Sequence, residues 1–182
     1  MKNYCYLNFL LLFTLSLSLQ CRKPKSELEK LPPATQTGAD KFGCLIDGKA
    51  FLPKGNPFGG PILSCAYQFV NGGYYFQLKA FNNEGAVKYG VGVFTDSLNI
   101  ENGIKYTLKN RFTKAQASGI YSISNFGLVN YLTNDINTGE LKISKFDRIN
   151  RIVSGTFWFD AIDKQGQKVE VREGRFDLKY TL

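Results

Sequence analysis

The sequence predicts an all-β fold, an antiparallel β-sandwich or a partly open β-barrel of about nine or ten strands. From Phe42 onward, apolar and polar residues alternate with a period of two, which is typical of strands with one buried face. Turn sequences rich in glycine, asparagine and aspartate interrupt this alternation at regular intervals. No stretch beyond residue 38 shows the period of an amphipathic helix. A closed, lipocalin-like cup is the alternative architecture.

The first half of the predicted domain contains two hairpin signals. The stretch FGCLIDGKAFLP (42–53) predicts two short strands joined by Asp47-Gly48. The strands ILSCAYQFV and YYFQLKAF flank the turn sequence NGG (71–73). The next candidate strand, AVKYGVGVF, has Gly90 and Gly92 on one face, which suggests close approach of another backbone or a bend.

The second half continues in the same way. KYTL follows a turn at 101–103, GIYSISNFGLVNYLT supplies one or two strands, and NDINTGELKISKFD is a turn that leads into a strand. The final hairpin joins IVSGTFWFDAID to VEVREGRFDLKY through KQGQ. Its alternation predicts one buried and one solvent-exposed face. The buried set is Phe157, Phe159 and Ala161, then Phe176, Leu178 and Tyr180; the exposed set is Thr156, Trp158 and Asp160, then Arg175, Asp177 and Lys179.

The N-terminus has the features of an export signal. Lys2 precedes the apolar run YLNFLLLFTLSLSL, which is shorter than the roughly 20 residues of a membrane-spanning helix. We therefore interpret residues 1–20 as a signal peptide. Cleavage before Cys21 resembles the bacterial lipoprotein pattern, in which that cysteine is acylated and anchors the chain to a membrane. The alternative is an ordinary secreted protein with a coincidental cysteine.

Polar, proline-containing residues follow Cys21. We interpret residues 21–38 as the lipidated N-terminus and a flexible tether, and residues 39–182 as one all-β domain. Surface-exported lipoproteins of Bacteroidota typically carry an acidic cluster directly after this cysteine. Here the chain is basic, with Arg22, Lys23 and Lys25. This difference favours a domain that faces the periplasm.

Composition excludes several chemistries. The chain has no histidine, so histidine-dependent catalytic triads and histidine zinc sites are ruled out, and we expect no cofactor and no metal. The formal charge of +8 is spread over single lysines and arginines, so we expect no nucleic-acid partner. Cys44 and Cys65 would form a disulfide in an oxidising compartment, or remain two buried free thiols.

Two stretches carry a family resemblance. These are LPPATQTGADKFGCLIDGKAFLP (31–53) and GELKISKFDRINRIVSGTFWFDAIDKQGQKVEVREGRFDLKY (139–180). Together they resemble an uncharacterised envelope lipoprotein family of Bacteroidota, catalogued as a domain of unknown function. The resemblance implies a cell-envelope address and an all-β fold. It implies no activity, because that family has none assigned.

Three groups of residues are candidate sites. NDINTGE (134–140) has oxygen ligands like those of a calcium loop, but its spacing departs from that of an EF-hand, and a polar turn is the simpler interpretation. The acidic pairs Asp160 with Asp163 and Glu170 with Glu173 could serve glycan hydrolysis, but exposed carboxylates with ordinary pKa values are the simpler interpretation. Aromatic residues that could form an outward binding surface are Trp158, Tyr74 and Phe58.

The sequence therefore favours a non-enzymatic, membrane-anchored binding or scaffold domain of the cell envelope. Its partner would be an envelope protein, a glycan or a lipid. A carrier that holds an apolar small molecule in a barrel-like cup is the first alternative. A glycan-acting hydrolase is the second.

Overall fold

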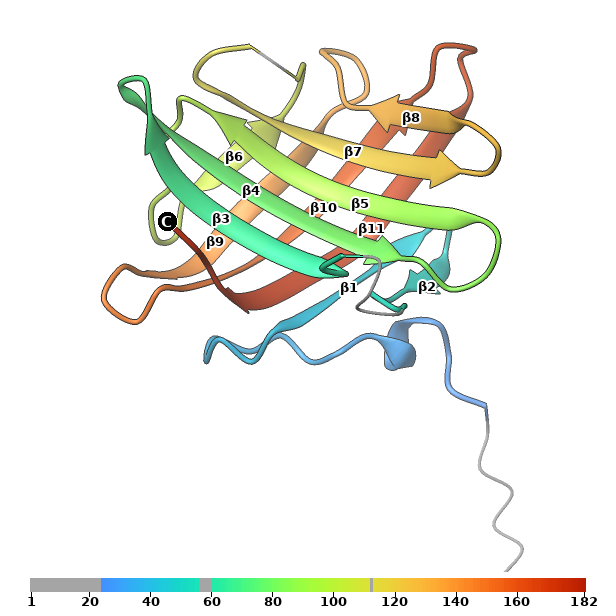
Figure 1. The fold of residues 1–182 in the computed structure, drawn as a ribbon, viewed down its shortest axis with the longest axis horizontal. Coiled ribbons are helices and arrows are strands. Elements are labelled where there is room, and N and C mark those ends of the chain that lie inside the picture. Colours follow the sequence, from blue (N-terminus) through green and yellow to red (C-terminus); the bar gives the residue numbers. More distant parts are fainter. Residues whose placement is uncertain (1–23, 56–59, 112) are drawn as a thin grey trace, which may run out of the picture.

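The structure is a computed structural model that describes residues 24–55, 60–111 and 113–182. These residues form eleven strands in one sheet, preceded by the 3₁₀ helix η1 (Leu28–Lys30) (Figure 1). The strands are β1 (Lys41–Ile46), β2 (Lys49–Phe51), β3 (Leu63–Val70), β4 (Gly73–Asn82), β5 (Lys88–Asp96), β6 (Lys105–Leu108), β7 (Gln116–Ser124), β8 (Leu128–Leu132), β9 (Gly139–Asp147), β10 (Ile152–Ile162) and β11 (Lys168–Lys179). The prediction of an all-β fold is confirmed, and the described strands pair antiparallel except β6 with β7, which pair in parallel.

The sheet coils back on itself without closing into a regular barrel. Its strand order is β2-β1-β11-β10-β9-β6-β7-β5-β4-β3, and β8 lies off this path, paired with β7 and β10. The layer β3–β4–β5–β7 crosses over the layer β1–β11–β10–β9 (Figure 1). The chain end ties the two layers together, because the Tyr67 N–H of β3 donates to the Thr181 carbonyl at 2.8 Å.

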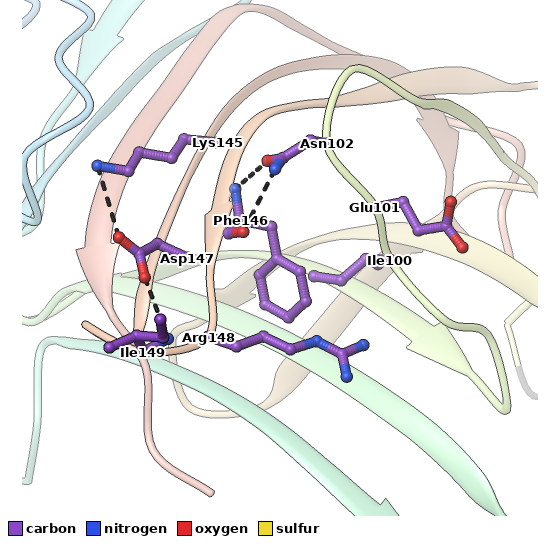
Figure 2. A pocket seen from close by; sticks show the side chains of 8 residues that line it. All are labelled: Ile100, Glu101, Asn102, Lys145, Phe146, Asp147, Arg148 and Ile149. Atoms are coloured by element: carbon purple, nitrogen blue, oxygen red, sulfur yellow. Dashed lines mark hydrogen bonds and ion pairs between the residues drawn. The ribbon is translucent and has the colours of Figure 1, made fainter.

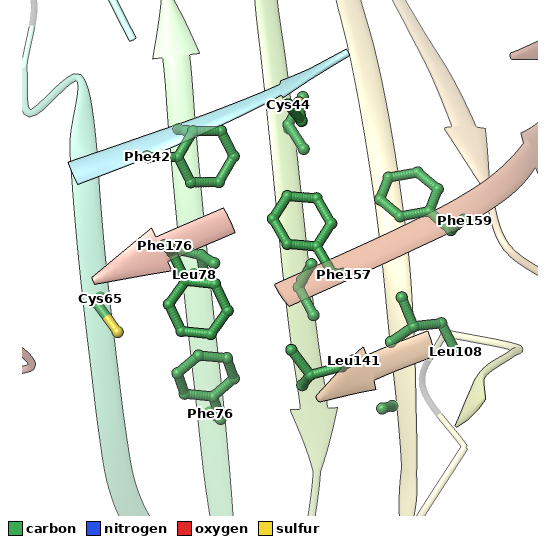
Figure 3. Close-up of a cluster of buried hydrophobic side chains, with 14 of the residues drawn as sticks. Phe42, Cys44, Cys65, Phe76, Leu78, Leu108, Leu141, Phe157, Phe159 and Phe176 are labelled. Atoms are coloured by element: carbon green, nitrogen blue, oxygen red, sulfur yellow. The ribbon is translucent and has the colours of Figure 1, made fainter. Parts of the chain in front are cut away.

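The core fills the space between the two layers. Figure 3 shows phenylalanine and leucine side chains of both layers pointing toward one another. The rings of Phe42 and Phe157 stack at 5.6 Å, and the Phe157 and Phe176 centroids lie 6.4 Å apart. Each such side chain, when fully buried, contributes roughly 1.5–3 kcal/mol relative to exposure in water.

The predicted hairpins are present with the expected turn geometry. Asp47 and Gly48 have φ of 47° and 78°, and Asn71 and Gly72 have φ of 50° and 84°. Two successive left-handed residues define a type I′ turn, which asparagine, aspartate and glycine adopt at low cost. These turns fix the register of β1 with β2 and of β3 with β4.

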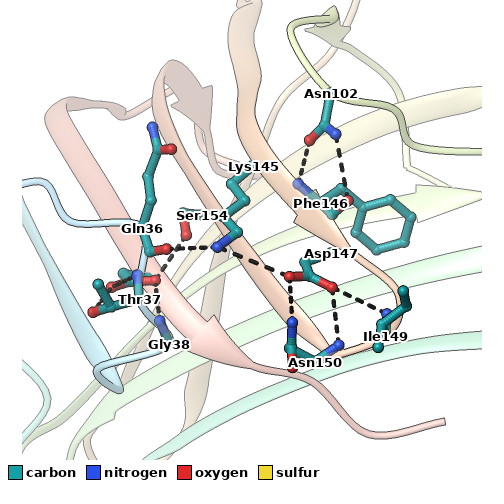
Figure 4. Close-up of polar contacts among 11 residues, drawn as sticks. Gln36, Thr37, Gly38, Asn102, Lys145, Phe146, Asp147, Ile149, Asn150 and Ser154 are labelled. Carbon is teal, nitrogen blue, oxygen red and sulfur yellow. Dashed lines mark hydrogen bonds and ion pairs between the residues drawn. The ribbon is translucent and has the colours of Figure 1, made fainter.

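Residues 31–38, which we call the strap, differ from the flexible tether expected of them. Leu31 is buried, and a Cβ atom on Gly43 would lie 2.7 Å from the Pro32 ring, so the strap packs closely on β1. Lys145 donates from Nζ to the Gln36 carbonyl at 3.0 Å (Figure 4). The ordered unit therefore begins before the predicted boundary at residue 39, because the strap has its own apolar and polar contacts with the sheet.

Some of the predictions lie outside the described residues. These are the signal peptide of residues 1–20, the acylation site Cys21 and the loop residue Phe58. Within the described ranges, no helix has the length and apolar character needed to cross a membrane.

Candidate binding surfaces

Two turns build the first candidate surface. The β3–β4 hairpin carries Phe69 and Val70 at its end. In the β9–β10 turn, Asp147 Oδ1 accepts hydrogen bonds from the N–H groups of Ile149 and Asn150 at 3.1 and 2.9 Å. An aspartate that bonds the backbone two and three residues ahead is a common turn former. This turn holds Arg148 and Ile149 beside the hollow drawn in Figure 2.

A layer of aromatic rings supports these turns. The rings of Tyr67 and Tyr74 stack at 4.9 Å with an interplanar angle of 3°. Phe146 and Tyr180 meet the edge of Tyr67 at 4.9 and 6.0 Å. Phe69 lies 4.9 Å from Tyr74 on the outer side. Burial raises the pKa of the Tyr67 hydroxyl, so this group stays protonated and acts as a hydrogen-bond donor at neutral pH.

Arg148 lies over this aromatic layer. Its guanidinium carbon is 5.4 Å from the Phe146 ring centre and 5.6 Å from that of Tyr74, within the range of a cation–π contact. Its Nη2 donates to Asn99 Oδ1 at 3.1 Å, and the same oxygen accepts from the Tyr67 hydroxyl. These contacts fix the guanidinium at the surface.

Exposed apolar side chains surround this arginine. We define the Arg148 surface as Phe69, Val70, Tyr74, Arg148, Ile149 and Leu182. Within it Phe69 is 64% exposed, Ile149 93% and Leu182 67%. Two shallow hollows, of about 580 and 520 Å³, meet at Arg148. An exposed apolar surface centred on an ordered arginine suits contact with another molecule.

The second candidate surface lies on the outer face of β10 and β11. Trp158 is 42% exposed, whereas its neighbours Phe157 and Phe159 are buried. The Arg172 guanidinium carbon lies 5.5 Å from the Trp158 ring centre. The sequence left open whether this face is exposed to solvent or is a second buried face. In the structure it is exposed to solvent.

The acidic pairs on this face are paired with cations or turn amides. Asp160 accepts from Arg172 Nη2 at 2.6 Å and lies 2.8 Å from Lys168 Nζ. Burial alone would raise the Asp160 pKa, but Lys168 and Arg172 outweigh it and lower the pKa. Asp163 accepts the N–H groups of its own turn. A general acid for glycan hydrolysis needs a raised pKa, and Asp160 has the opposite shift.

The calcium-loop candidate is a hydrogen-bonded turn. Asn134 Oδ1 accepts the N–H groups of Ile136 and Asn137, and Asp135 accepts from Asn110 Nδ2 at 2.6 Å. Glu140 forms an ion pair with Lys105 at 3.1 Å. Across the part of the chain that the structure describes, no group of three or more histidine, cysteine, aspartate or glutamate side chains is placed to hold a metal.

The two cysteines of the domain are free, buried thiols on β1 and β3 (Figure 3). The sequence left open a disulfide between Cys44 and Cys65 or two buried free thiols, and the structure holds them as free thiols. Burial raises the pKa of both thiols well above the usual range, which makes them poor nucleophiles.

Sequence reasoning found only part of the Arg148 surface. Tyr74 was predicted, and it lies there in a half-buried position; Trp158 belongs to a separate surface. Phe69, Arg148 and Ile149 were missed. Arg148 and Ile149 follow Asp147 in the turn sequence FDRIN, and the Asp-x-x-Asn pattern of a tight turn was the available signal.

Comparison with known proteins gives one match. Residues 95–177 match the family described as domain of unknown function DUF6252. The matched range contains β9 and β10, and therefore both Arg148 and Trp158. No curated protein and no solved structure matches the chain. The fold and its surfaces thus define an all-β domain with an exposed aromatic and arginine surface. The family model that residues 95–177 match is one without an assigned function.

Proposed function

We propose that this chain is a non-enzymatic binding or scaffold domain of the bacterial cell envelope, and that its Arg148 surface contacts a protein partner. The observation that carries the proposal is the ring of exposed apolar side chains around an arginine fixed over aromatic rings. Exposed apolar patches of this kind mark contact sites. Tyrosine, phenylalanine and arginine are enriched at the centres of protein interfaces and often dominate their binding energy.

The chemistry of the second surface supports a non-enzymatic role. Its carboxylates are neutralised by Lys168 and Arg172, and the chain has no histidine to act as a base.

The proposal includes a membrane anchor. The signal sequence, Cys21 and the resemblance to Bacteroidota lipoproteins support acylation of Cys21 and a domain that faces the periplasm. The free tether is shorter than expected, because the chain already contacts the sheet at Glu27, whose Oε2 accepts the Ala50 N–H at 2.8 Å. At a maximum of about 3.5 Å per residue, the six residue steps from Cys21 to Glu27 would keep the domain within roughly 20 Å of the membrane.

The interface is tested by site-specific photo-cross-linking in cells. A photoreactive residue at Val70, inside the Arg148 surface, should give one defined cross-linked partner. The same residue at Lys49, the exposed first residue of β2, is the matched control. Arg148→Glu should abolish the Val70 cross-link without unfolding the domain. Equal products from both positions, or a Val70 product that survives Arg148→Glu, would contradict the proposal.

The anchor is tested separately by intact mass and cell fractionation. We expect the mature wild-type chain to begin at Cys21 and to carry added acyl mass. The Cys21→Ala variant should no longer be found in the membrane fraction. An unmodified chain cleaved elsewhere would argue for a free protein.

Two alternatives have specific tests. A carrier would have to displace packed core side chains such as Phe76 and Phe159, both fully buried, so the core opposes it. Co-purified lipid inside the folded domain would favour it. A glycan contact is favoured by one observation, the exposed Trp158 beside Arg172. Quenching of tryptophan fluorescence by soluble peptidoglycan fragments would support that second function.

A further inference from the structure

A third surface, separate from the Arg148 surface, lies at the edge of β8. This strand pairs with β7 from Ile120↔Leu132 to Ser124↔Leu128. On its other side, within the described ranges, it meets β10 only at Leu132↔Ile162. The rest of β8 therefore has an open edge, although the strand lies within a large sheet (Figure 1).

The pairing shows which backbone groups face this edge. The Thr133 N–H donates to the Gly119 carbonyl of β7 at 3.2 Å. In an antiparallel pair, successive residues direct their backbone groups alternately toward and away from the partner strand. Tyr131 therefore faces β7, whereas Asn130 faces away. By the same alternation Leu128 also faces away, so Leu128 and Asn130 direct their N–H and C=O groups to the open edge.

The sequence of β8 does not protect this edge. Proteins usually shield exposed edges with lysine, proline or a bulge. Here the strand reads LVNYL, with Leu128 67% and Val129 41% exposed. An apolar, unshielded edge favours the addition of another strand.

A cleft lies beside the edge. It has a volume of about 490 Å³ and is lined by β8 and by the end of β10 with the first residues of the β10–β11 turn, residues 162–165. A segment that paired with the open edge of β8 would therefore lie between these two elements.

The charged groups of the cleft favour an acidic occupant. Lys164 is exposed on the β10–β11 turn, and Arg111, whose guanidinium lies 4.3 Å from the Phe94 ring centre, is also among the residues that line the cleft. The carboxylate of Asp163 is engaged by the N–H groups of Gln165 and Gln167 at 2.9 and 2.8 Å. Arg111 and Lys164 together with Asp163 give the residues that line the cleft a formal net charge of +1.

We propose that this cleft binds an extended, acidic segment of a partner polypeptide, which adds as a strand to the edge of β8. The segment would exchange backbone hydrogen bonds with Leu128 and Asn130 and place a carboxylate near Lys164. The inference does not depend on the Arg148 surface.

The test uses a capped peptide of alternating valine and glutamate, titrated into the isotope-labelled full chain and followed by NMR. Peptide binding should slow hydrogen exchange of the Leu128 and Asn130 amides by about tenfold or more. A peptide N-methylated at alternate residues should bind about tenfold more weakly or not at all, as should one with lysine in place of glutamate. Equal binding of the N-methylated peptide, or no protection of these two amides, would overturn the proposal.

Variants locate the site. Asn130→Pro removes an amide that faces the open edge, a position at which an edge strand tolerates proline, and should abolish binding while the thermal unfolding midpoint stays unchanged. Lys164→Glu should weaken binding of the acidic peptide and leave the fold intact. If Asn130→Pro does not fold, the binding measured with Lys164→Glu tests the proposed site. If both amides are protected without peptide and the chain sediments as a dimer, the occupant is a second copy and the proposal is wrong.

Discussion

The backbone N–H of Gly38 donates a hydrogen bond to Asp177 Oδ1 across 2.7 Å, and this bond joins the strap to the last strand of the sheet. The same carboxylate accepts from Thr35 Oγ1 at 2.7 Å, from the Thr37 N–H at 2.9 Å and from Ser154 Oγ at 2.7 Å. Asp177 is 1% exposed. One buried carboxylate thus organises the strap, β10 and β11 together.

Removing this carboxylate should release the strap. We expect Asp177→Ala to lower the free energy of unfolding by about 3 kcal/mol, because buried N–H and hydroxyl donors lose a charged acceptor. Urea unfolding measures the change, and limited proteolysis between residues 31 and 38 reports release of the strap. Thr35→Val, which removes one donor, should cost only about 1 kcal/mol. An unchanged proteolysis pattern in Asp177→Ala would show that apolar contacts alone hold the strap.

Asp177 should also make stability depend on pH. Burial by itself would raise its pKa, but the hydrogen bonds from Thr35, Thr37, Ser154 and Gly38 outweigh burial and hold the pKa well below its usual range. Because the folded pKa is depressed, the contribution is complete above the unfolded value of about 3.9 and is lost as pH falls toward the folded pKa. The difference in unfolding free energy between the wild type and Asp177→Asn should therefore be constant near neutral pH and shrink below about pH 4. If urea unfolding gives the same free-energy difference between the two proteins at every pH in this range, the low pKa assigned to Asp177 is refuted.

The sequence predicted the fold where local signals and the tertiary structure agree. The turns at Asp47-Gly48 and Asn71-Gly72 and the alternation around Phe157 all appear as expected. The alternation of β11 misled at Asp177, which was expected on the exposed face. The strap covers that face, and a contact between segments so far apart in sequence leaves no periodic signal. The register of β11 also shifts near Glu173, whose φ is 54°, so buried positions change from odd to even numbers along one strand.

The binding surfaces were predictable only in part, for a related reason. Trp158 follows from the alternation within one strand. The Arg148 surface combines a hairpin end, a distant turn and the chain end, so it needs the sheet order before it can be recognised. The open edge of β8 likewise depends on how far β8 runs alongside β10, which no local pattern specifies.

The buried thiols should be unreactive in the folded chain. Burial raises the pKa of Cys44 and Cys65, so little thiolate is present at neutral pH. We expect iodoacetamide to leave both unmodified in the native protein and to alkylate both in urea, as read by mass spectrometry of peptides. Alkylation in urea only after reduction would instead reveal a disulfide between them.

Gly139 should be intolerant of a side chain. A Cβ atom there would fall against the Trp158 carbonyl and 2.7 Å from the Phe159 Cα, where β9 pairs with β10. We expect Gly139→Ala to cost about 1–3 kcal/mol of unfolding free energy, because two backbones must separate. Gly127→Ala is the control: nothing lies within 4 Å of its Cβ position, and the change should stay within about 0.5 kcal/mol. Equal effects of the two substitutions would mean that β9 and β10 are less closely paired.

Neighbouring aromatic residues on β10 test the assignment of its two faces. Phe157 is 3% exposed and packs against Phe42 and Phe176, whereas Trp158 is 42% exposed. Truncation of Phe157 to alanine should cost about 3–5 kcal/mol of unfolding free energy, because it leaves a cavity between the layers. Trp158→Ala should cost under about 1 kcal/mol, because it removes a surface contact with Arg172. Calorimetry of both variants tests whether the face of Trp158 is exposed. If that face were buried, Trp158→Ala would cost as much unfolding free energy as Phe157→Ala. A small cost at Trp158 would leave its exposed ring unexplained by stability and would strengthen the case for a ligand on that face.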